Sequence, residues 1–248
     1  MRAKPVRLPE KPKDGPPGAK PLEDVWLDGT DLHRVLSGQF PEKVYRSSEL
    51  YDVEPRLGIA RNNARRTAND GLLYQTRHLR PRPELSIGVT VSGIPADSHP
   101  ECGVIRFGGE GRPSAVTVDD APPRLTPLEI HGQNMLLMLL THADFGGGWL
   151  LPGFKPDTQG DVKVWRGQLH GVELMLHSAV LGKAAREGGW DLLRKQPRPV
   201  RSLIPAGSVY FCTVTGDARA AATALHGGHV GCDTALGRGE LAVGLWKS

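Results

Sequence analysis

The fold is decided by a stretch near the end of the chain, Ser208-Val-Tyr-Phe-Cys-Thr-Val-Thr-Gly-Asp-Ala-Arg-Ala-Ala-Ala-Thr-Ala-Leu-His226. Its first part, Ser208 to Val214, predicts a strand, and Asp217 to His226 predicts a capped, alanine-rich helix. Two glycines directly after His226 end this helix. The apolar run from Leu241 to Trp246 predicts a last strand. Strands joined through a short helix predict an α+β fold.

The spacing of apolar residues predicts further elements upstream. Residues 25–38 form a short amphipathic helix that Thr30 caps. The clearest strand pattern runs from Leu85 to Ser92, where apolar and polar residues alternate. Val104–Phe107 and Ala115–Val118 flank a glycine loop and predict a hairpin or two short strands.

Three more segments complete the predicted order. Thr126–Gln133 is predicted as a short helix and Val172–Leu181 as a strand. Asn134–Thr141 fits either a continuation of that helix or a buried strand, which periodicity cannot separate. The order strand, short helix, strand, strand, helix, strand is that of a ferredoxin-like unit. We therefore expect an antiparallel sheet with helices on one face and long loop or hairpin insertions.

Positive charge is concentrated in two windows. Between Glu54 and Glu84 seven arginines face three acids, a local balance of +4 that equals the formal net charge of the whole chain. The window from Lys183 to Arg201 carries six cations against two acids. Arginine binds phosphate bidentately and also lies flat on bases, and Tyr74 in the first window offers a stacking ring. We expect these two cationic strips to converge in space and bind RNA.

Composition argues against several other classes. The longest apolar run, Met135 to Leu140, is too short to cross a bilayer. Cys102, Cys212 and Cys232 follow no pairing pattern and no leader opens the chain, so we expect a reducing, cytoplasmic setting. Residues 1–24 hold six prolines among lysines and glycines, which predicts a flexible segment. We expect no cofactor.

Four segments together resemble one family. They are Arg56-Leu-Gly-Ile59 with Thr67-Ala-Asn-Asp-Gly-Leu-Leu-Tyr74 and Leu79-Arg80, then Phe107-Gly-Gly-Glu-Gly-Arg112, Gly147-Gly-Trp-Leu-Leu-Pro152, and Gly188-Gly-Trp-Asp-Leu192 with Pro199 to Phe211. In this order they are similar to the Cmr-three subunits of type III-B CRISPR effector complexes, which belong to the RAMP superfamily, Cas-five group. The resemblance extends from Val25 to Trp246.

The resemblance implies a fold, a ligand and partners. Such subunits have ferredoxin-like, RRM-related domains that hold the repeat-derived 5′ handle of the guide RNA, or crRNA. They dock to the large polymerase-like subunit and to backbone RAMP subunits, and target cleavage belongs to other subunits. The implied organisation is a flexible segment at 1–24, a short helix and connection at 25–52, and a RAMP domain at 53–248 with a basic insertion at 54–84.

The chain departs from the family pattern in two places. No counterpart of the N-terminal RAMP half precedes Val25, which leaves open a fragment, a missing half supplied by a separate polypeptide, or a compacted variant. The run Leu236 to Gly244 resembles the glycine-rich RAMP loop but lacks the aromatic residue that often follows its second glycine. RNA contact by this loop is therefore less well supported than contact by the first window.

The predicted RNA-binding residues are of three kinds. Arginines neutralise phosphate, aromatic rings stack on bases and glycines allow close backbone approach. The set comprises Arg56, Arg61, Arg65, Arg66, Arg77, Arg80, Arg112, Tyr74, Trp190, Gly237, Arg238 and Gly239. Plainer alternatives are a solvated hairpin for the first window, a tight turn for Gly108–Gly111 beside Arg112, and a core anchor for Trp190.

Histidines raise the possibility of two other kinds of site. His226, His229 and Cys232 would offer two imidazoles and a thiolate to zinc, but no Cys-x-x-Cys accompanies them and the glycines between them suit a RAMP loop. We expect no metal there. His78, His142 and His177 are candidates for acid–base cleavage of RNA, although none lies in a recognisable catalytic motif. We expect a noncatalytic RNA-binding subunit, with an endoribonuclease or a purely structural scaffold as alternatives.

Overall fold

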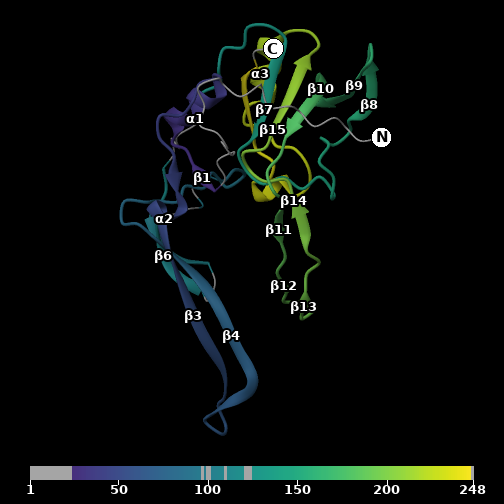
Figure 1. Ribbon diagram of the computed structural model, residues 1–248. Helices are drawn as coiled ribbons and strands as arrows, with labels where there is room; N and C mark the ends of the chain where they lie inside the picture. The colour runs from purple at the N-terminus through teal and green to yellow at the C-terminus, as the bar shows by residue number, and fades with distance from the viewer. Residues whose placement is uncertain (1–23, 96–97, 99–101, 109–110, 120–124, 247–248) are drawn as a thin grey trace, which may run out of the picture. The chain divides into compact units, whose positions relative to one another are not determined.

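The computed structural model describes residues 24–95, 98, 102–108, 111–119 and 125–246, in two compact units (Figure 1). The described residues of Leu27–Val44 and Leu125–Ser248 form the core unit, and those of Asp24–Trp26 and Tyr45–Arg124 form the hairpin unit. Antiparallel strands dominate both units and helices are few, so the fold is α+β and rich in sheet. Residues 1–23 of the predicted flexible segment lie outside the described residues.

The core unit is built on a six-stranded sheet with the order β16-β7-β15-β10-β9-β8, in which all neighbours are antiparallel. Its elements are α1 (Gly29–Leu36), β7 (Asn134–Leu139), β8 (Lys155–Gln159), β9 (Val162–Leu169), β10 (Val172–Val180), β15 (Val209–Val214), α3 (Ala218–Leu225), the 3-10 helix η2 (Thr234–Leu236) and β16 (Leu241–Leu245). Between β10 and β15 the chain forms a narrow ribbon, in which β11 (Ala185–Glu187) pairs with β14 (Arg201–Leu203) and β12 (Trp190–Asp191) pairs with β13 (Gln196–Pro197).

The hairpin unit consists mainly of two antiparallel hairpins. The longer one joins β3 (Tyr51–Asn62) to β4 (Thr67–Pro81), and the shorter one joins β5 (Cys102–Phe107) to β6 (Arg112–Thr117). At the base of the longer hairpin, β1 (Val25–Trp26) pairs with β2 (Tyr45–Arg46), and α2 (Ser47–Leu50) leads directly into β3.

Both faces of the central strand β7 are buried, because its apolar residues point alternately to two cores. Met135, Leu137 and Leu139 pack on the side of α3, whereas Leu136 packs with Leu36 of α1 on the other side. The expectation of helices on one face of the sheet is therefore wrong. The cause lies in α1, whose apolar stripe is needed to cover the second apolar face of β7 and β16.

Several predicted elements are confirmed. The helix after Asp217 forms, and the Asp217 carboxylate accepts the N–H groups of Arg219 and Ala220 as an N-cap. The strands predicted around β10, β15 and β16 are present, as is the hairpin of β5 and β6. The ambiguous stretch from Asn134 forms the strand β7 and not a helix.

Other predictions are wrong. Leu85 to Ser92 forms no strand, because no neighbouring strand pairs with it, and Thr126 to Gln133 forms no helix. The N-cap of α1 is Asp28, whose side chain accepts the Asp31 N–H at 2.8 Å, and not Thr30. The hairpin of β8 and β9 was not predicted, since the polar run Lys155–Gln159 lacks the apolar alternation of a half-buried strand.

Candidate nucleic-acid interface

The first cationic window forms the long hairpin of β3 and β4. Its ladder runs from the pair Tyr51–Pro81 to the pair Asn62–Thr67, with one irregularity between Ile59 and Arg61. At the turn, the Asn62 side-chain oxygen accepts the N–H groups of Ala64 at 3.1 Å and Arg65 at 3.0 Å. Asn62 thus fixes the turn through its side chain, as asparagine commonly does.

One face of this hairpin is polar. Residues directly opposite in an antiparallel ladder point to the same side, so the pairs Glu54–His78, Arg56–Thr76 and Gly58–Tyr74 share this face. The alternating residue Arg80 lies on it as well. The ladder therefore brings together three of the predicted RNA-binding side chains, those of Arg56, Tyr74 and Arg80.

Glu54 neutralises part of the charge on the polar face. Arg56 donates a hydrogen bond of 3.0 Å to one carboxylate oxygen of Glu54, and Arg80 forms an ion pair with the other. The hydrogen bond from Arg56, together with the charges of Arg80, Arg56 and His78, holds the pKa of Glu54 below its ordinary value. Glu54 is therefore ionised at neutral pH, and Arg56 and Arg80 together leave one uncompensated positive charge on this face.

Tyr74 is seated on the backbone of the facing strand. A Cβ added to Gly58 would lie 2.1 Å from Cζ of Tyr74, so the ring occupies the space that any larger residue at position 58 would fill. The ring nevertheless stays 49% exposed. Beside it, the buried hydroxyl of Thr76 has no hydrogen-bond partner among the described residues. A supported ring with one open side is suited to a stacked base.

The opposite face of the hairpin is apolar and exposed. It carries Val53, Leu57, Ile59, Leu73 and Leu79. Arg77, which is paired with Pro55 in the ladder, also lies on this face. The hairpin therefore separates Arg77 from the polar face that holds Arg56, Tyr74 and Arg80, although all four were predicted to act together.

The tip of the hairpin carries the free charge of the first window. Arg61, at the end of β3, and Arg65 and Arg66, in the turn, are all exposed. Among the side chains that the structure describes, none of the three has an acidic partner. Nearer the base, Arg56, Arg80 and Arg82 are each paired with Glu54 or Asp52, and Arg77 on the apolar face is unpaired. The tip thus holds three of the four arginines of this window that have no acidic partner among the described side chains.

The remaining predicted residues lie elsewhere. Arg112 begins β6 opposite Phe107 and is exposed on the shorter hairpin. Trp190 lies on the ribbon opposite Pro197 and is 54% exposed, so the core-anchor alternative is wrong for it. The two cationic strips belong to different units, the first to the hairpin unit and the second to the core unit. Their convergence stays a prediction.

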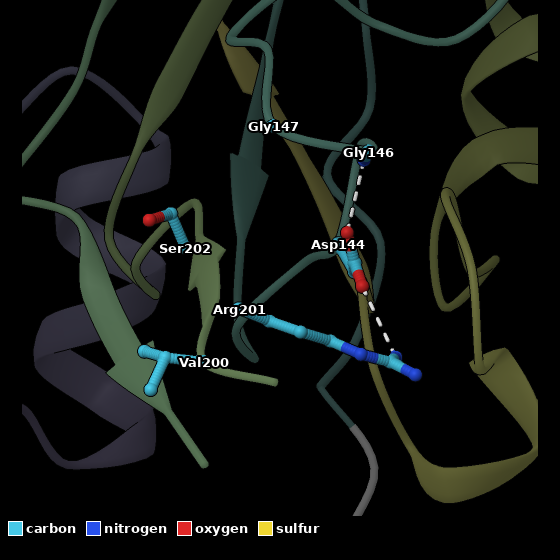
Figure 2. Close-up of a pocket in the computed structure, with 6 residues that line it drawn as sticks. All are labelled: Asp144, Gly146, Gly147, Val200, Arg201 and Ser202. Carbon is cyan, nitrogen blue, oxygen red and sulfur yellow. Dashed lines mark hydrogen bonds and ion pairs between the residues drawn. The ribbon is translucent and has the colours of Figure 1, made fainter. Parts of the chain in front are cut away.

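Arg201 of the second strip is held by two carboxylates. It forms an ion pair of 3.2 Å with Asp144 (Figure 2). It forms another with Asp233. Asp144 is 7% exposed and also accepts the N–H of Gly146 at 2.9 Å. Asp144, Gly146 and Arg201 line a cavity of about 450 Å³ together with Gly147, Val200 and Ser202. Asp233, and to a smaller extent Asp144, raises the pKa of Arg201 through hydrogen bonds and negative charge. Because these carboxylates already bind the Arg201 guanidinium, it is not free to bind phosphate.

Arg238 and Gly239 serve the protein's own structure. The Arg238 guanidinium is mostly buried and pairs with Glu187 of β11, which lies opposite Arg201 in the ribbon ladder. A Cβ added to Gly239, whose φ is +70°, would lie 1.9 Å from the carbonyl oxygen of Val230. The close backbone approach predicted at Gly239 is therefore made by the chain itself, while the space around Gly237 is open.

His226 and His229 hold the loop that follows α3. Nδ1 of His226 accepts the Val243 N–H at 3.3 Å, which leaves the ring proton on Nε2 to donate to the Leu125 carbonyl at 3.0 Å. His229 Nδ1 contacts the Arg238 carbonyl at 2.8 Å. Gly227 and Gly228 form backbone hydrogen bonds with Leu241, so this loop covers the outer edge of β16. Among the described residues no group of three potential ligands could hold a metal ion.

The three candidate catalytic histidines lie in different surroundings. His78 faces Glu54 in the long hairpin, and His142 Nδ1 accepts the Ala206 N–H at 2.9 Å. His177 lies at an irregularity between β10 and β15, with Nε2 2.7 Å from the Thr213 hydroxyl and its ring 5.3 Å from that of Trp246. Burial, assisted by the charge of Arg166, lowers the pKa of His177 below 6.5.

The lowered pKa of His177 predicts a loss of stability in mild acid. Below pH 6.5 the unfolded chain protonates this imidazole before the folded chain does, so the free energy of unfolding should fall as pH decreases from 6.5 toward the folded-state pKa. The substitution His177→Asn should reduce this acid dependence and leave the stability above about pH 8 less affected. Urea unfolding followed by tryptophan fluorescence, once below pH 6.5 and once at about pH 8, measures this acid dependence in both proteins. Equal acid dependence in the two proteins would contradict the assignment.

Several residues that shape these surfaces were not predicted. Gly58 seats Tyr74, Asn62 fixes the hairpin turn, and Asp144 with Asp233 and Glu187 holds the root of the ribbon. A glycine within an apolar strand and an asparagine before a turn are signals that could have identified the first two. The acidic partners of the ribbon are distant in sequence from the arginines they bind, and no local pattern reveals them.

Comparisons with known proteins give one family and several solved structures. The model of the family described as CRISPR-associated protein (Cas_Cmr3) matches residues 2–246. A chain from a cryo-EM structure of the Type III-B Cmr-beta bound to cognate target RNA and AMPPnP is 17% identical, with 66% of this chain and 47% of that chain covered and a TM-score of 0.38. A chain from Cmr-beta bound to cognate target RNA alone is 19% identical, with 75% and 56% covered and a TM-score of 0.40. Comparison with curated proteins found no match.

The matched region spans about half the length of the chains in those solved structures. None of the described helices is both long and apolar enough to cross a membrane.

Proposed function

Because the chain belongs to the Cas_Cmr3 family of CRISPR-associated proteins, we propose that it is a noncatalytic subunit of a type III-B effector complex that holds the 5′ handle of the crRNA. The observation that carries this proposal is the tip of the β3–β4 hairpin, where Arg61, Arg65 and Arg66 have no acidic partner among the described side chains. Free guanidinium groups on the same hairpin as a supported, half-exposed tyrosine match a bent single strand, which offers phosphates and unstacked bases together.

The proposed partners are the crRNA, the large polymerase-like subunit and backbone RAMP subunits, with a separate chain for the N-terminal RAMP half as one alternative. The proposed setting is the cytoplasm, where the three cysteines, all free thiols in the structure, would stay reduced. The sequence of the target would be read by base pairing with the guide, while this subunit sets the position of the guide's end.

We also propose that β7, β10, β15 and β16 form a ferredoxin-like unit. Along the sheet they lie in the order fourth, first, third, second, and α3 connects the third to the fourth. In chain order, the β8–β9 hairpin takes the place of the first helix of such a unit, between β7 and β10. An experimental structure in which β16 does not pair with β7, or in which β15 does not lie between β7 and β10, would contradict it.

Photo-crosslinking of assembled complexes tests the RNA proposal. A crRNA with 4-thiouridine at successive handle positions should crosslink to peptides from residues 51–81, whereas the same label in the guide segment should not. The RNA should be recovered intact after incubation without metal ions. Handle crosslinks confined to other subunits would refute the binding role. Cleavage at one position that His78→Ala, His142→Ala or His177→Ala abolishes would instead support the endoribonuclease alternative.

A further inference from the structure

The ribbon of the core unit ends in an exposed apolar tip. Leu192 and Leu193, in the turn between β12 and β13, are 83% and 92% exposed, and Val200 and Trp190 are exposed behind them. Figure 1 shows the ribbon leaving the core unit below β15, with β12 and β13 at its far end. These two leucines contribute no burial of apolar surface to the stability of the fold, since both are exposed.

The tip has a defined conformation. The Asp191 carboxylate accepts the backbone N–H groups of Leu193 at 3.0 Å and Arg194 at 2.9 Å, and Lys195 closes the turn with a φ of +52°. These contacts fix the backbone from which both leucines project. A side chain on a fixed turn loses less conformational entropy on binding than one on a mobile loop, which favours a docking role.

The root of the ribbon is fixed as well. Glu187 and Arg201 lie opposite each other where the β11–β14 ladder ends. Glu187 binds Arg238, and Arg201 binds Asp144 and Asp233. Ion pairs to three separate residues of the core unit hold both strands of the ribbon, so its direction from the core unit is set in the free chain.

Positive charge lies beside the apolar tip. Arg194 and Lys195 in the turn and Arg198 just after β13 are exposed and have no ion-pair partner among the described residues, and neither do Lys183 and Arg186 near the root of the ribbon. The two acids of the ribbon are engaged internally, Glu187 with Arg238 and Asp191 with the turn. An apolar tip flanked by three free cations is complementary to an apolar pocket rimmed by carboxylates.

We propose that the ribbon tip docks into an acidic-rimmed apolar pocket on a protein subunit of the complex. The inference rests on the proposed function and names the surface through which this chain would bind a protein partner. A protein is favoured over RNA as the occupant because Leu192 and Leu193 are aliphatic, whereas bases bind single-stranded RNA sites by stacking on aromatic rings or guanidinium planes. The cations would speed association, and the two leucines would determine how long the complex lasts.

Binding of the full chain to the purified large polymerase-like subunit and to a purified backbone RAMP subunit tests this proposal. The double substitution Leu192→Ser with Leu193→Ser should weaken binding to one of them by about tenfold to a hundredfold, mainly through faster dissociation. Val162→Ser, at the exposed turn of β8 and β9 in the same unit, is the matched control and should change affinity less than about twofold. Arg194→Ala with Lys195→Ala should slow association and reduce its dependence on salt.

A parallel measurement with a handle-bearing crRNA separates this proposal from the RNA-binding role. The leucine variant should bind the RNA like the wild-type chain, whereas substitutions at the tip of the β3–β4 hairpin should weaken RNA binding and leave the protein contact intact. If neither subunit binds the wild-type chain, or if the leucine variant loses RNA affinity and keeps its protein affinity, the docking proposal is wrong. Neither result decides the handle-binding proposal, which is tested separately by photo-crosslinking to the crRNA handle.

Discussion

Replacing Arg61, Arg65 and Arg66 together by alanine is expected to weaken binding of a handle-bearing crRNA by about a hundredfold near physiological salt. All three guanidinium groups are exposed at the hairpin tip and none has an acidic partner among the described side chains, so each is available to a phosphate without first breaking an ion pair. Three lost phosphate contacts on a single strand should also reduce the slope of log affinity against log salt by about 2. Filter binding between about 50 and 200 mM salt measures both effects.

The matched control lies at the base of the same hairpin. Arg82 forms an ion pair of 3.0 Å with Asp52, so the double substitution Arg82→Gln with Asp52→Asn removes an arginine while keeping the net charge. It should leave both affinity and salt slope nearly unchanged. If the alanine variant retains full affinity and slope while it still binds its protein partners, the scaffold alternative gains support. An equally large change in affinity and salt slope in the control variant would mean that RNA binding depends on the stability of the hairpin and not on its free charge.

The substitution Gly239→Ala should destabilise the core unit by about 4 kcal/mol, from a strained backbone and a steric collision acting together. The new Cβ would lie 1.9 Å from the Val230 carbonyl oxygen, which belongs to backbone and cannot move aside as a flexible side chain could. Val230 and Gly239 are also joined by a backbone hydrogen bond of 2.9 Å. The collision therefore separates the two segments that hold the C-terminal loop.

Gly237→Ala provides the comparison, because Gly237 has a similar φ of +78° but open space around it. It should cost only about 1 kcal/mol, from the left-handed backbone alone. Urea unfolding followed by tryptophan fluorescence compares the two variants, since Trp149, Trp165 and Trp246 all lie in the core unit. Equal losses at both positions would show that the Val230 contact does not determine the effect. A selective loss of RNA affinity in Gly237→Ala, without loss of stability, would favour the predicted RNA approach at that glycine.

The sequence allowed good predictions where local chemistry determines the structure. Asp217 followed by alanines forms α3, and the apolar runs around β10, β15 and β16 form strands, because capping and burial act within a few residues. Leu85 to Ser92 shows the limit of this reasoning. Its alternation is as regular as any in the chain, yet a strand also needs a neighbour to pair with, and no local pattern supplies that information.

The candidate site was predictable in composition but not in arrangement. Clustered arginines around Tyr74 predicted a cationic RNA-binding surface, with a solvated hairpin as the alternative, and the structure forms a hairpin whose RNA contact stays a prediction. The partners of each arginine depend on strand register and on distant carboxylates: Glu54 takes Arg56 and Arg80, and Asp144 takes Arg201 from 57 residues away. Sequence reasoning treated all arginines of a window alike, whereas these acids determine which of them remain available.

The polar strand β8 affects how readily copies of the chain can pair with one another at the edge of the sheet. By adding β9 and β8 beyond β10, the sheet places its open margin on Lys155-Pro-Asp-Thr-Gln159 and not on the apolar β10. Lysine and proline on a margin discourage intermolecular strand pairing, which is an early step toward amyloid-like aggregates. The opposite margin is closed by the glycine loop over β16. Both margins of the sheet are therefore poor templates for pairing with a second copy of the chain.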